Sequence, residues 1–473
     1  MLLIEKEIHI SLPKENISPL KHFEQAVKKH LSIGEIPVRF AVTKSEADGY
    51  HCELGILTDS NSLPTGQQIS IFDFEQRKVE NTDKFNTVMI VPTGIGAEIG
   101  GHAGDATPAA RLLAGVCDKL ITHPNVVNAS DINEMPENGL YVEGSVISSL
   151  LMGTVGLQEV RSNRVLLVID EHEDKQVSEL AINAASAARA TLGLDCPGVI
   201  KINPPIYLRA EYSSSGSAVG RVEGLERLLE VLYRRRSEFD AVALASKVDI
   251  SEGLYAEYFQ SGGEIINPWG GVEAMLTHSI SLLVNVPSAH APMAEDMEEV
   301  NALFGIVDPR MSAEAVSSCF LHCVLKGLYK SPRIITDRML FTHPGVLTAA
   351  DVSCMVIPDG CVGLPTLAAL EQGIPVIAVR ENRNRMKNNL QQLPFVAGKL
   401  FIVENYLEAV GVMSALKAGV SVASVRRPLA FTNVCEEAAK DKREIEKQPF
   451  EFRAIDRANH EGSIPKKMSE GHK

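Results

Sequence analysis

The sequence is poor in aromatic residues and has no long apolar runs. Tryptophan occurs once in 473 residues, and aromatic residues make up 5% of a chain that is 45% hydrophobic. The core must therefore be built mainly from aliphatic side chains. No uncharged apolar stretch reaches the roughly 18 residues that a membrane-spanning helix requires. The first residues, MLLIEKEIHISLPKE, also lack an apolar run of signal-peptide length, so neither a leader nor membrane attachment is expected.

The sequence also has no excess of positive charge. The chain has 46 Lys and Arg residues against 60 Asp and Glu residues, a formal net charge of −14. An acidic surface repels phosphate backbones, so we expect no nucleic-acid partner. The eight cysteines are scattered along the chain, unlike the dense cysteine frameworks of short secreted proteins. We therefore expect reduced thiols and a cytoplasmic location, while a homo-oligomer remains open.

The length of 473 residues predicts two or three domains, because a single core stops growing at about 250–300 residues. Short alternating segments surround one helical stretch near the N-terminus, which is typical of a small α+β cap. From residue 86 onward, apolar strands alternate with helices, which predicts parallel sheets covered on both faces. We predict an α/β fold with two Rossmann-like parallel-sheet lobes around a cleft. The expected parts are the cap at 1–85, the first lobe at 86–330, the second lobe at 331–428 and a charged, partly disordered tail at 429–473.

Individual segments fit this α/β pattern. Apolar runs predict strands at 86–92, 163–171, 239–246 and 279–287. Helical patterns are found at 18–31, 107–121, 175–193 and 364–372.

The strongest candidate for a functional site is the glycine-rich segment 92–108, between a predicted strand and a predicted helix. Glycine loses more conformational entropy on folding than any other residue. The concentration of glycines in this segment therefore suggests a functional or structural requirement. They let backbone amides approach a ligand, and the following helix N-terminus favours a phosphate or carboxylate. The spacing matches neither a dinucleotide fingerprint nor a P-loop. We predict anion binding by Thr93, Gly94, Gly96, Gly100 and Gly101.

Four residues are candidates for proton transfer. His102 and Asp105 lie three residues apart in the glycine-rich segment, where they suit general acid–base partners. His123 and His343 occupy matching positions in THPNVVNASD and THPGVLTAAD, which begin at Thr122 and Thr342. This repeated sequence pattern, called the echo below, indicates either two similar lobes or two ordinary proline-containing turns. We predict catalytic roles for His102, Asp105, His123 and His343, and no metal site.

Further ligand-binding candidates follow other predicted strands or begin predicted helices. Asn125, Asn128 and Glu143 fall in one short region that suits sugar hydroxyls or an amino acid. Trp269 can stack on a planar ligand, and Arg310 can clamp an anion through two hydrogen bonds. The remaining candidates are Gly270 and Gly271, which follow the tryptophan, and Asp359, Gly360, Arg380 and Asn382 in the second lobe.

Two resemblances to known families are present. Over about forty residues of the predicted second lobe, the order of strand, glycine loop, helix, Gly-x-Pro, strand and arginine resembles the donor-binding half of two-lobed glycosyltransferases and sugar-nucleotide epimerases. In those proteins the loop amides hold a diphosphate. Over about residues 85–425 the chain resembles the uncharacterised proteins grouped as domain of unknown function 3326. The motifs that carry this second resemblance are Pro92–Asp105, Leu120–Asn128, Tyr141–Gly144, Ala185–Gly193, Ser288–Pro292 and Tyr406–Gly411.

The second resemblance implies fold boundaries and no chemistry, because that family has no established reaction. The chain departs from the family pattern at Gly101-His102, where the family has a glycine–aromatic pair. It also departs at Asn125-Val-Val-Asn128-Ala-Ser. His102 is therefore not implied to be a catalytic group common to the family.

Three functions remain open. The favoured one is an enzyme that acts on a small anionic metabolite, phosphorylated or nucleotide-linked, by group transfer or isomerisation. It rests on the glycine loops at strand–helix junctions, one in each predicted lobe. A hydrolase, lyase or racemase of a small amino acid or carboxylate, with or without a metal, is suggested by the His and Asn clusters. A non-catalytic metabolite-binding protein is the third. The sequence indicates no particular cofactor.

Overall fold

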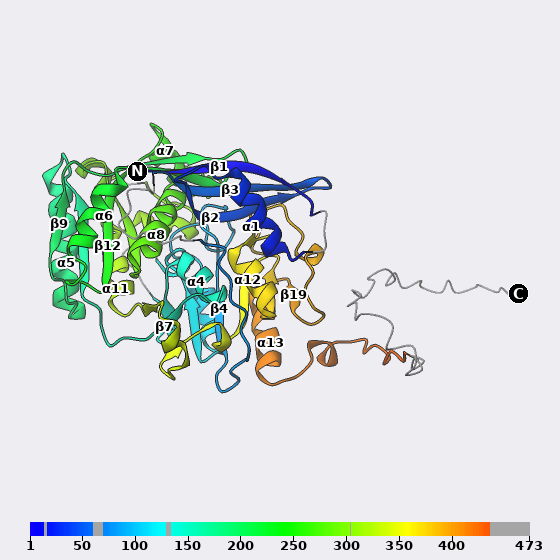
Figure 1. Cartoon of the computed structure of the whole chain (residues 1–473). Coiled ribbons are helices and arrows are strands. Elements are labelled where there is room, and N and C mark those ends of the chain that lie inside the picture. Colours follow the sequence, from blue (N-terminus) through cyan, green and yellow to red (C-terminus); the bar gives the residue numbers. More distant parts are fainter. Residues whose placement is uncertain (14–16, 60–69, 129–133, 303, 436–473) are drawn as a thin grey trace, which may run out of the picture. The chain divides into compact units, whose positions relative to one another are not determined.

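The computed structural model describes residues 1–13, 17–59, 70–128, 134–302 and 304–435 (Figure 1). It confirms the predicted α/β fold. The described residues up to Val422 form one compact unit, and the described residues from Ala423 onward are separate from it. Most of the predicted tail, 436–473, lies outside the described residues. The echo beginning at Thr122 also extends into residues 129–133, which are not described.

In the described residues, the largest sheet has ten strands and is mixed. Its N-terminal strands pair antiparallel, with Leu3 opposite Leu57 and Ser11 opposite Gly49, whereas β8, β9, β12 and β13 are parallel. The strand order is β17 (Val362–Gly363), β2 (Ile36–Ser45), β3 (Gly49–Leu57), β1 (Leu2–Ser11), β11 (Ala218–Glu223), β10 (Tyr207–Tyr212), β12 (Ala241–Asp249), β8 (Val165–Asp170) and β9 (Val199–Ile202), with β13 (Ser288–Met293) beside β12.

The second large sheet is parallel throughout. Its strands are short, and the three at Asn86–Met89, Val352–Pro358 and Val376–Val379 are fully buried, as expected for a sheet covered by helices. Their order is β19 (Leu400–Val403), β18 (Val376–Val379), β16 (Val352–Pro358), β4 (Asn86–Met89), β5 (Lys119–Thr122) and β6 (Gly139–Tyr141). A small antiparallel sheet joins β14 (Arg333–Ile335), β7 (Gly156–Gln158) and β15 (Val346–Leu347).

Helices connect most of these strands (Figure 1). The α-helices of the described residues are α1 (Pro19–His30), α2 (Thr107–Ala114), α3 (Pro124–Val127), α4 (Gly144–Leu151), α5 (Lys175–Leu192), α6 (Leu225–Arg234), α7 (Leu254–Gln260), α8 (Gly270–Val284), α9 (Met297–Val300), α10 (Ser312–Ala315), α11 (Leu321–Tyr329), α12 (Leu364–Gln372) and α13 (Tyr406–Lys417). Short 3-10 helices lie at Pro309–Met311, Arg338–Thr342, Ala349–Asp351, Leu390–Gln392 and Val422–Val425.

Two predicted segments differ from the structure. The strand predicted at 279–287 is wrong, because most of this run is the C-terminal half of α8, and β13 begins after it at Ser288. Helix α8 is buried on nearly all sides. In such a helix apolar residues follow one another without a gap, so the sequence does not show the 3.6-residue period that distinguishes a helix from a strand. The helix predicted at 107–121 ends at Ala114, and the apolar residues after Gly115 form β5 instead.

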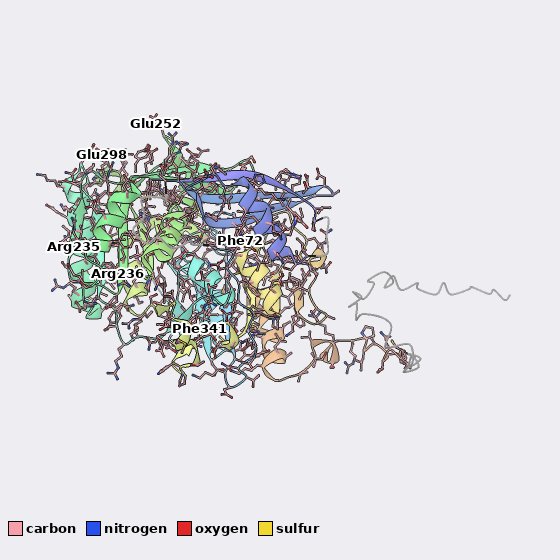
Figure 2. All side chains as sticks on the ribbon, in the orientation of Figure 1. Phe72, Arg235, Arg236, Glu252, Glu298 and Phe341 are labelled. Carbon is pink, nitrogen blue, oxygen red and sulfur yellow. The ribbon has the colours of Figure 1, made fainter. Side chains whose placement is uncertain are left out.

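The sheets draw strands from across the predicted boundaries at 85 and 331. Strands β1, β2 and β3 of the predicted cap belong to the same sheet as β10–β12. Strand β4 pairs with β16, so one sheet combines three strands of the predicted second lobe (β19, β18 and β16) with three of the predicted first lobe (β4, β5 and β6). Helix α1 covers the N-terminal strands, with Phe23 against Phe40 and Phe40 against Phe72, at ring-centroid distances of 5.2 and 5.4 Å (Phe72 is labelled in Figure 2).

Gln372, at the end of α12, ties distant segments of the chain together. Its buried amide nitrogen donates to the carbonyl oxygens of Glu75 (2.8 Å) and Leu151 (3.0 Å). Its amide oxygen accepts from the backbone N–H of Arg77 (2.7 Å). One side chain therefore satisfies backbone groups of two other segments.

Replacing Gln372 with alanine should destabilise the protein clearly. The substitution leaves three backbone groups without their partner, at roughly 1 kcal/mol or more each, so we expect a loss of about 2–4 kcal/mol of unfolding free energy. Chemical denaturation measures this loss. The exposed Gln391 is the matched control, and Gln391→Ala should change stability by less than about 0.5 kcal/mol. Equal stability of the two variants would contradict the assigned role.

Candidate functional site

A cavity of about 260 Å³ lies between the two large sheets. Its wall includes the first turns of α4, α8 and α12, part of β2, and the chain that follows β4 and β5. Helix α8 packs against β2, β11, β13 and α4, and it contributes a long stripe of side chains to the cavity. Pockets at such a meeting point of sheet and helix ends commonly bind small molecules.

The structure brings nine of the predicted site residues together in this cavity. They come from the glycine-rich segment, from the chain after β5, and from the starts of α4 and α8. These residues are Thr93, Gly94, Gly101, His123, Asn125, Asn128, Glu143, Gly270 and Gly271.

The other predicted residues lie outside this cavity. His343 is exposed, and its Nδ1 accepts from the backbone N–H of Gly345. Arg310 pairs with Asp308 and Glu98, and Arg380 pairs with Glu404. The remaining residues outside the cavity are Gly96, Gly100, His102, Asp105, Trp269, Asp359, Gly360 and Asn382.

The two echo segments have different structures. Pro124–Val127 forms α3, and His123 before it is buried. The matching His343 follows a 3-10 helix and precedes β15, and it is exposed. The two histidines therefore do not occupy equivalent positions.

The glycines of segment 92–108 serve close packing of the chain. A Cβ on Gly94 would lie 2.5 Å from the Ala218 carbonyl oxygen, and one on Gly101 would lie 2.1 Å from that of Ala97. Several amides of this segment already have partners within the protein. Those of Ile99, Gly100, His102 and Ala103 donate to side chains, at 2.9, 2.8, 3.4 and 2.5 Å. These four amides are therefore not free to hold an anion.

Helix N-termini contribute positive potential at the cavity. Helices α8 and α12 begin at the cavity wall, and their N-cap residues, Trp269 and Gly363, make no capping side-chain hydrogen bond. At α8 the Asn267 side-chain oxygen accepts from the N–H groups of Trp269 and Gly270, at 3.1 and 3.3 Å. Unsatisfied N–H groups and the helix dipole make such ends electropositive. Helix α8 starts with Gly270 and Gly271, and a Cβ on Gly271 would lie 2.0 Å from the Ala218 carbonyl oxygen, so this glycine also lets the helix start pack against β11. The start of α4 differs, because the Glu143 carboxylate caps it by accepting from the Ser145 N–H at 3.0 Å.

One carboxylate–imidazole pair presents its imidazole to the cavity. The Glu143 carboxylate contacts Nδ1 of His278, and their side chains are 3% and 18% exposed. Burial raises the pKa of Glu143, but His278 and the hydrogen bonds from Ser145 lower it more, so its pKa lies below the ordinary value. Glu143 is thus an ionised carboxylate that orients His278.

A second carboxylate–imidazole pair presents its carboxylate to the cavity. Glu273 Oε1 lies 2.8 Å from Nδ1 of His290, and Nε2 of His290 lies 2.7 Å from the Ser246 hydroxyl. The side chain of Glu273 is 21% exposed, whereas that of His290 is 0% exposed. Here the imidazole, anchored by Ser246, orients the carboxylate. The cavity therefore receives an imidazole from one pair and a carboxylate from the other.

Sequence reasoning missed Glu273, His278, His290 and Ser246. Glu273 and His278 lie on α8, just before the run 279–287 that was predicted to be a strand, so the helix that carries both was not recognised. His290 and Ser246 lie on β13 and β12, two parallel strands that are adjacent only in the fold. The available signal was the density of polar residues in the apolar segments 273–278 and 288–292.

His123 supports the backbone of the site. Its Nε2 accepts from the Val91 N–H at 3.1 Å, so the proton of the neutral ring is on Nδ1. Burial lowers the pKa of His123 to about 4, and nearby His278 adds to this effect. Asn125 acts beside it by donating to the carbonyl oxygens of Val91 and Gly100, at 3.0 and 2.8 Å. His123 is therefore a neutral acceptor at pH 7.

His102 and Asp105 belong to a buried network behind the cavity. Nδ1 of His102 lies 2.8 Å from the Tyr258 hydroxyl, and burial lowers the pKa of His102 to about 4. Asp105 accepts from the backbone N–H groups of Gly100 and His102, and burial raises its pKa to about 7. The two side chains are thus linked through the loop backbone.

Three further observations concern the described residues only. They contain no group of three His, Cys, Asp or Glu side chains that could hold a metal ion. None of their helices is both long enough and apolar enough to cross a membrane. All eight cysteines are free thiols.

Comparison with known proteins identifies the family. Residues 86–426 match the model of a family described as proteins of unknown function, DUF3326. The chain belongs to this family. An uncharacterised lipoprotein from Synechococcus sp. is 33% identical over 352 residues, which cover 73% of this chain and 96% of the relative. The predicted family membership is confirmed, and the match begins at β4, so β1–β3 lie outside it.

The depressed pKa of His123 predicts a pH-dependent contribution to stability. The pKa of His123 is about 4 in the folded state and about 6.5 in the unfolded state. Between these pH values the folded state therefore binds fewer protons than the unfolded state. This histidine therefore costs the protein about 1.4 kcal/mol of stability for each unit that pH falls from about 6.5 toward 4. His123→Gln removes the effect, so denaturant unfolding should show the variant losing less stability on acidification. Parallel pH profiles for variant and wild type would contradict this assignment.

Proposed function

We propose that this family member is an enzyme that acts on a small anionic metabolite, phosphorylated or nucleotide-linked, by group transfer or isomerisation. One observation carries the proposal. A single cavity contains the N-termini of two helices, an imidazole backed by a carboxylate, and a carboxylate backed by an imidazole. The first feature suits an anion, and the other two suit proton transfer.

The anion would bind at the starts of α8 and α12. Each helix end carries roughly half a positive charge, and phosphate or carboxylate groups commonly bind there. The hydroxyl groups of Ser148 and Thr366 and the amide of Asn125 also line the cavity, but they already donate to backbone carbonyl oxygens. The helix ends are therefore the part of the wall that carries the anion proposal.

Glu273 and His278 would move the protons. In an isomerisation, Glu273 takes a proton from one carbon of the metabolite, and His278 in its protonated form returns one to another atom. In a group transfer, Glu273 deprotonates the incoming hydroxyl while His278 protonates the leaving group. In both cases the partners Glu143 and His290 hold the reacting groups in place.

A hydrolase is the second candidate because Ser246, His290 and Glu273 are connected in the order of a serine–histidine–acid triad. The Ser246 hydroxyl is buried and lies outside the cavity wall, which favours the first proposal. A fluorophosphonate probe distinguishes the two candidates. Labelling of Ser246 would support the hydrolase, and an unlabelled protein would support Glu273 as the reacting group.

The proposal keeps the cytoplasm as the site of action and excludes nucleic acid as a partner. Eight free cysteines suit a reducing compartment, and the net charge of −14 disfavours nucleic-acid binding. The name of the Synechococcus relative makes location a point to be tested by fractionation of the native host.

A thermal-shift screen with nucleotides, sugar nucleotides and phosphosugars tests the anion site. A ligand present at about a hundred times its Kd should stabilise the protein by about 2.7 kcal/mol. Ser148→Leu fills the cavity and should abolish the shift. Ser186→Leu on α5 is the matched control. The Ser186 hydroxyl, like that of Ser148, donates to the backbone carbonyl oxygen four residues before it, but Ser186 is exposed and lines neither cavity. No shift with any anionic compound would refute the proposal.

Glu273→Gln should separate catalysis from binding. With a metabolite found in the screen, deuterium incorporation from D2O or product formation is followed by NMR. The amide cannot accept a proton, so the rate should fall at least about 100-fold while the thermal shift is kept. Glu257→Gln, at an exposed position on α7, should retain the full rate. An unchanged rate in Glu273→Gln would remove Glu273 from the mechanism.

A further inference from the structure

A second cavity of about 150 Å³ lies next to the first. Residues of α5, α7, β13, α9 and α11 line it. It shares part of its wall with the first cavity, and this common wall consists of Ala103, Asn128, Asn267, Glu273 and His290. A ligand group in the second cavity would therefore lie close to the proposed reacting carboxylate.

Aromatic side chains dominate one side of this second cavity. Tyr255, Phe259, Trp269 and Phe304 all line it. Phe259 stacks on Phe304 with a centroid distance of 4.1 Å, and Tyr255 meets Trp269 edge to face at 5.9 Å. In a chain with 5% aromatic residues, this concentration is unusual. Rings arranged around a small space favour cations, which are attracted to their faces.

The charged groups of the second cavity are all acidic. Glu299, Glu314 and Glu273 line it, and its described lining residues include no lysine or arginine. Glu314 is fully enclosed, and burial raises its pKa to about 7. Its carboxylate accepts from the Ala103 N–H at 2.5 Å. Burial also raises the pKa of Glu299, whose carboxylate accepts from the Glu295 N–H at 2.6 Å.

We propose that the second cavity binds a small organic ammonium group. Aromatic rings together with carboxylates recognise alkylated ammonium ions in other proteins, and a bound cation would offset the cost of burying two carboxylates. The volume is sufficient, because an apolar cavity of about 150 Å³ holds benzene, and a trimethylammonium group is no larger.

The shared wall extends this inference to the substrate. Resting on the proposed function, the substrate carries an anionic group that binds in the first cavity and an ammonium group that binds in the second. Glu273 then lies between the two charged ends, beside the atoms that react. The ammonium site itself does not depend on that function.

A matched pair of compounds tests the site. Choline and its neutral isostere 3,3-dimethylbutan-1-ol have the same shape and differ in charge. Calorimetry and thermal shift on the full chain should show choline binding at least about tenfold more tightly than the alcohol. Sodium chloride at the same concentration controls for ionic strength. Equal binding of both compounds would show an apolar cavity and overturn the proposal, and so would binding of neither.

Two variants locate the bound cation. Glu299→Gln and Trp269→Leu should each weaken choline binding about tenfold, the first by removing charge and the second by removing a ring face. Glu298→Gln is the control, since Glu298 is next to Glu299 but exposed, at the outer edge of the view in Figure 2. Choline binding that is unaffected by Glu299→Gln and Trp269→Leu would overturn the assignment to this cavity.

The two proposals can fail separately. Ser148→Leu fills only the first cavity, so it should abolish anion binding and leave choline binding unchanged. If anionic compounds fail to bind and choline binds, the proposed function is wrong and the ammonium site stands. If anions bind and choline does not, this inference alone is wrong.

Discussion

The close approach of α8 to β11 is the contact on which the site depends. A Cβ on Gly271 would lie 2.0 Å from the Ala218 carbonyl oxygen, and one on Gly220 would lie 2.7 Å from Cβ of Val272. Two glycines therefore let the helix lie directly on the strand. This contact sets the depth and direction of α8, and with them the positions of its N-terminus, Glu273 and His278. A bulkier residue at either glycine would move all three.

The two carboxylate–imidazole pairs then join α8 to its neighbours. Glu143 comes from the start of α4, and His290 comes from β13. Each pair buries one member and leaves the other partly exposed, so the buried member is compensated and the exposed member is oriented. Burying a charge is tolerated when it is paired and hydrogen-bonded, and this condition is met for Glu143 by His278 and Ser145. The same arrangement that stabilises the packing also preorganises the site.

Much of the local structure could be predicted from the sequence. Helices α5 and α12 run as predicted, and each is followed by a glycine with positive φ, Gly193 or Gly373. Such glycines end helices by local backbone geometry alone. The α8 segment could not be predicted in the same way, because a helix buried on most sides lacks an amphipathic pattern. The loop glycines were predicted to bind an anion, and the structure shows that Gly94 and Gly101 serve chain packing as well as lining the cavity.

The sequence by itself determined the α/β class, the aliphatic core and the ends of several helices, since these follow from composition, period and local turn chemistry, and its motifs carried the resemblance to the family. Only the tertiary structure decided which polar residues meet. Glu143 and His278 are far apart in the chain, and so are Ser246 and His290, yet each pair is in contact. Strand order and helix packing create these contacts, and hydrophobic burial, which drives both, carries no signal at the polar positions themselves.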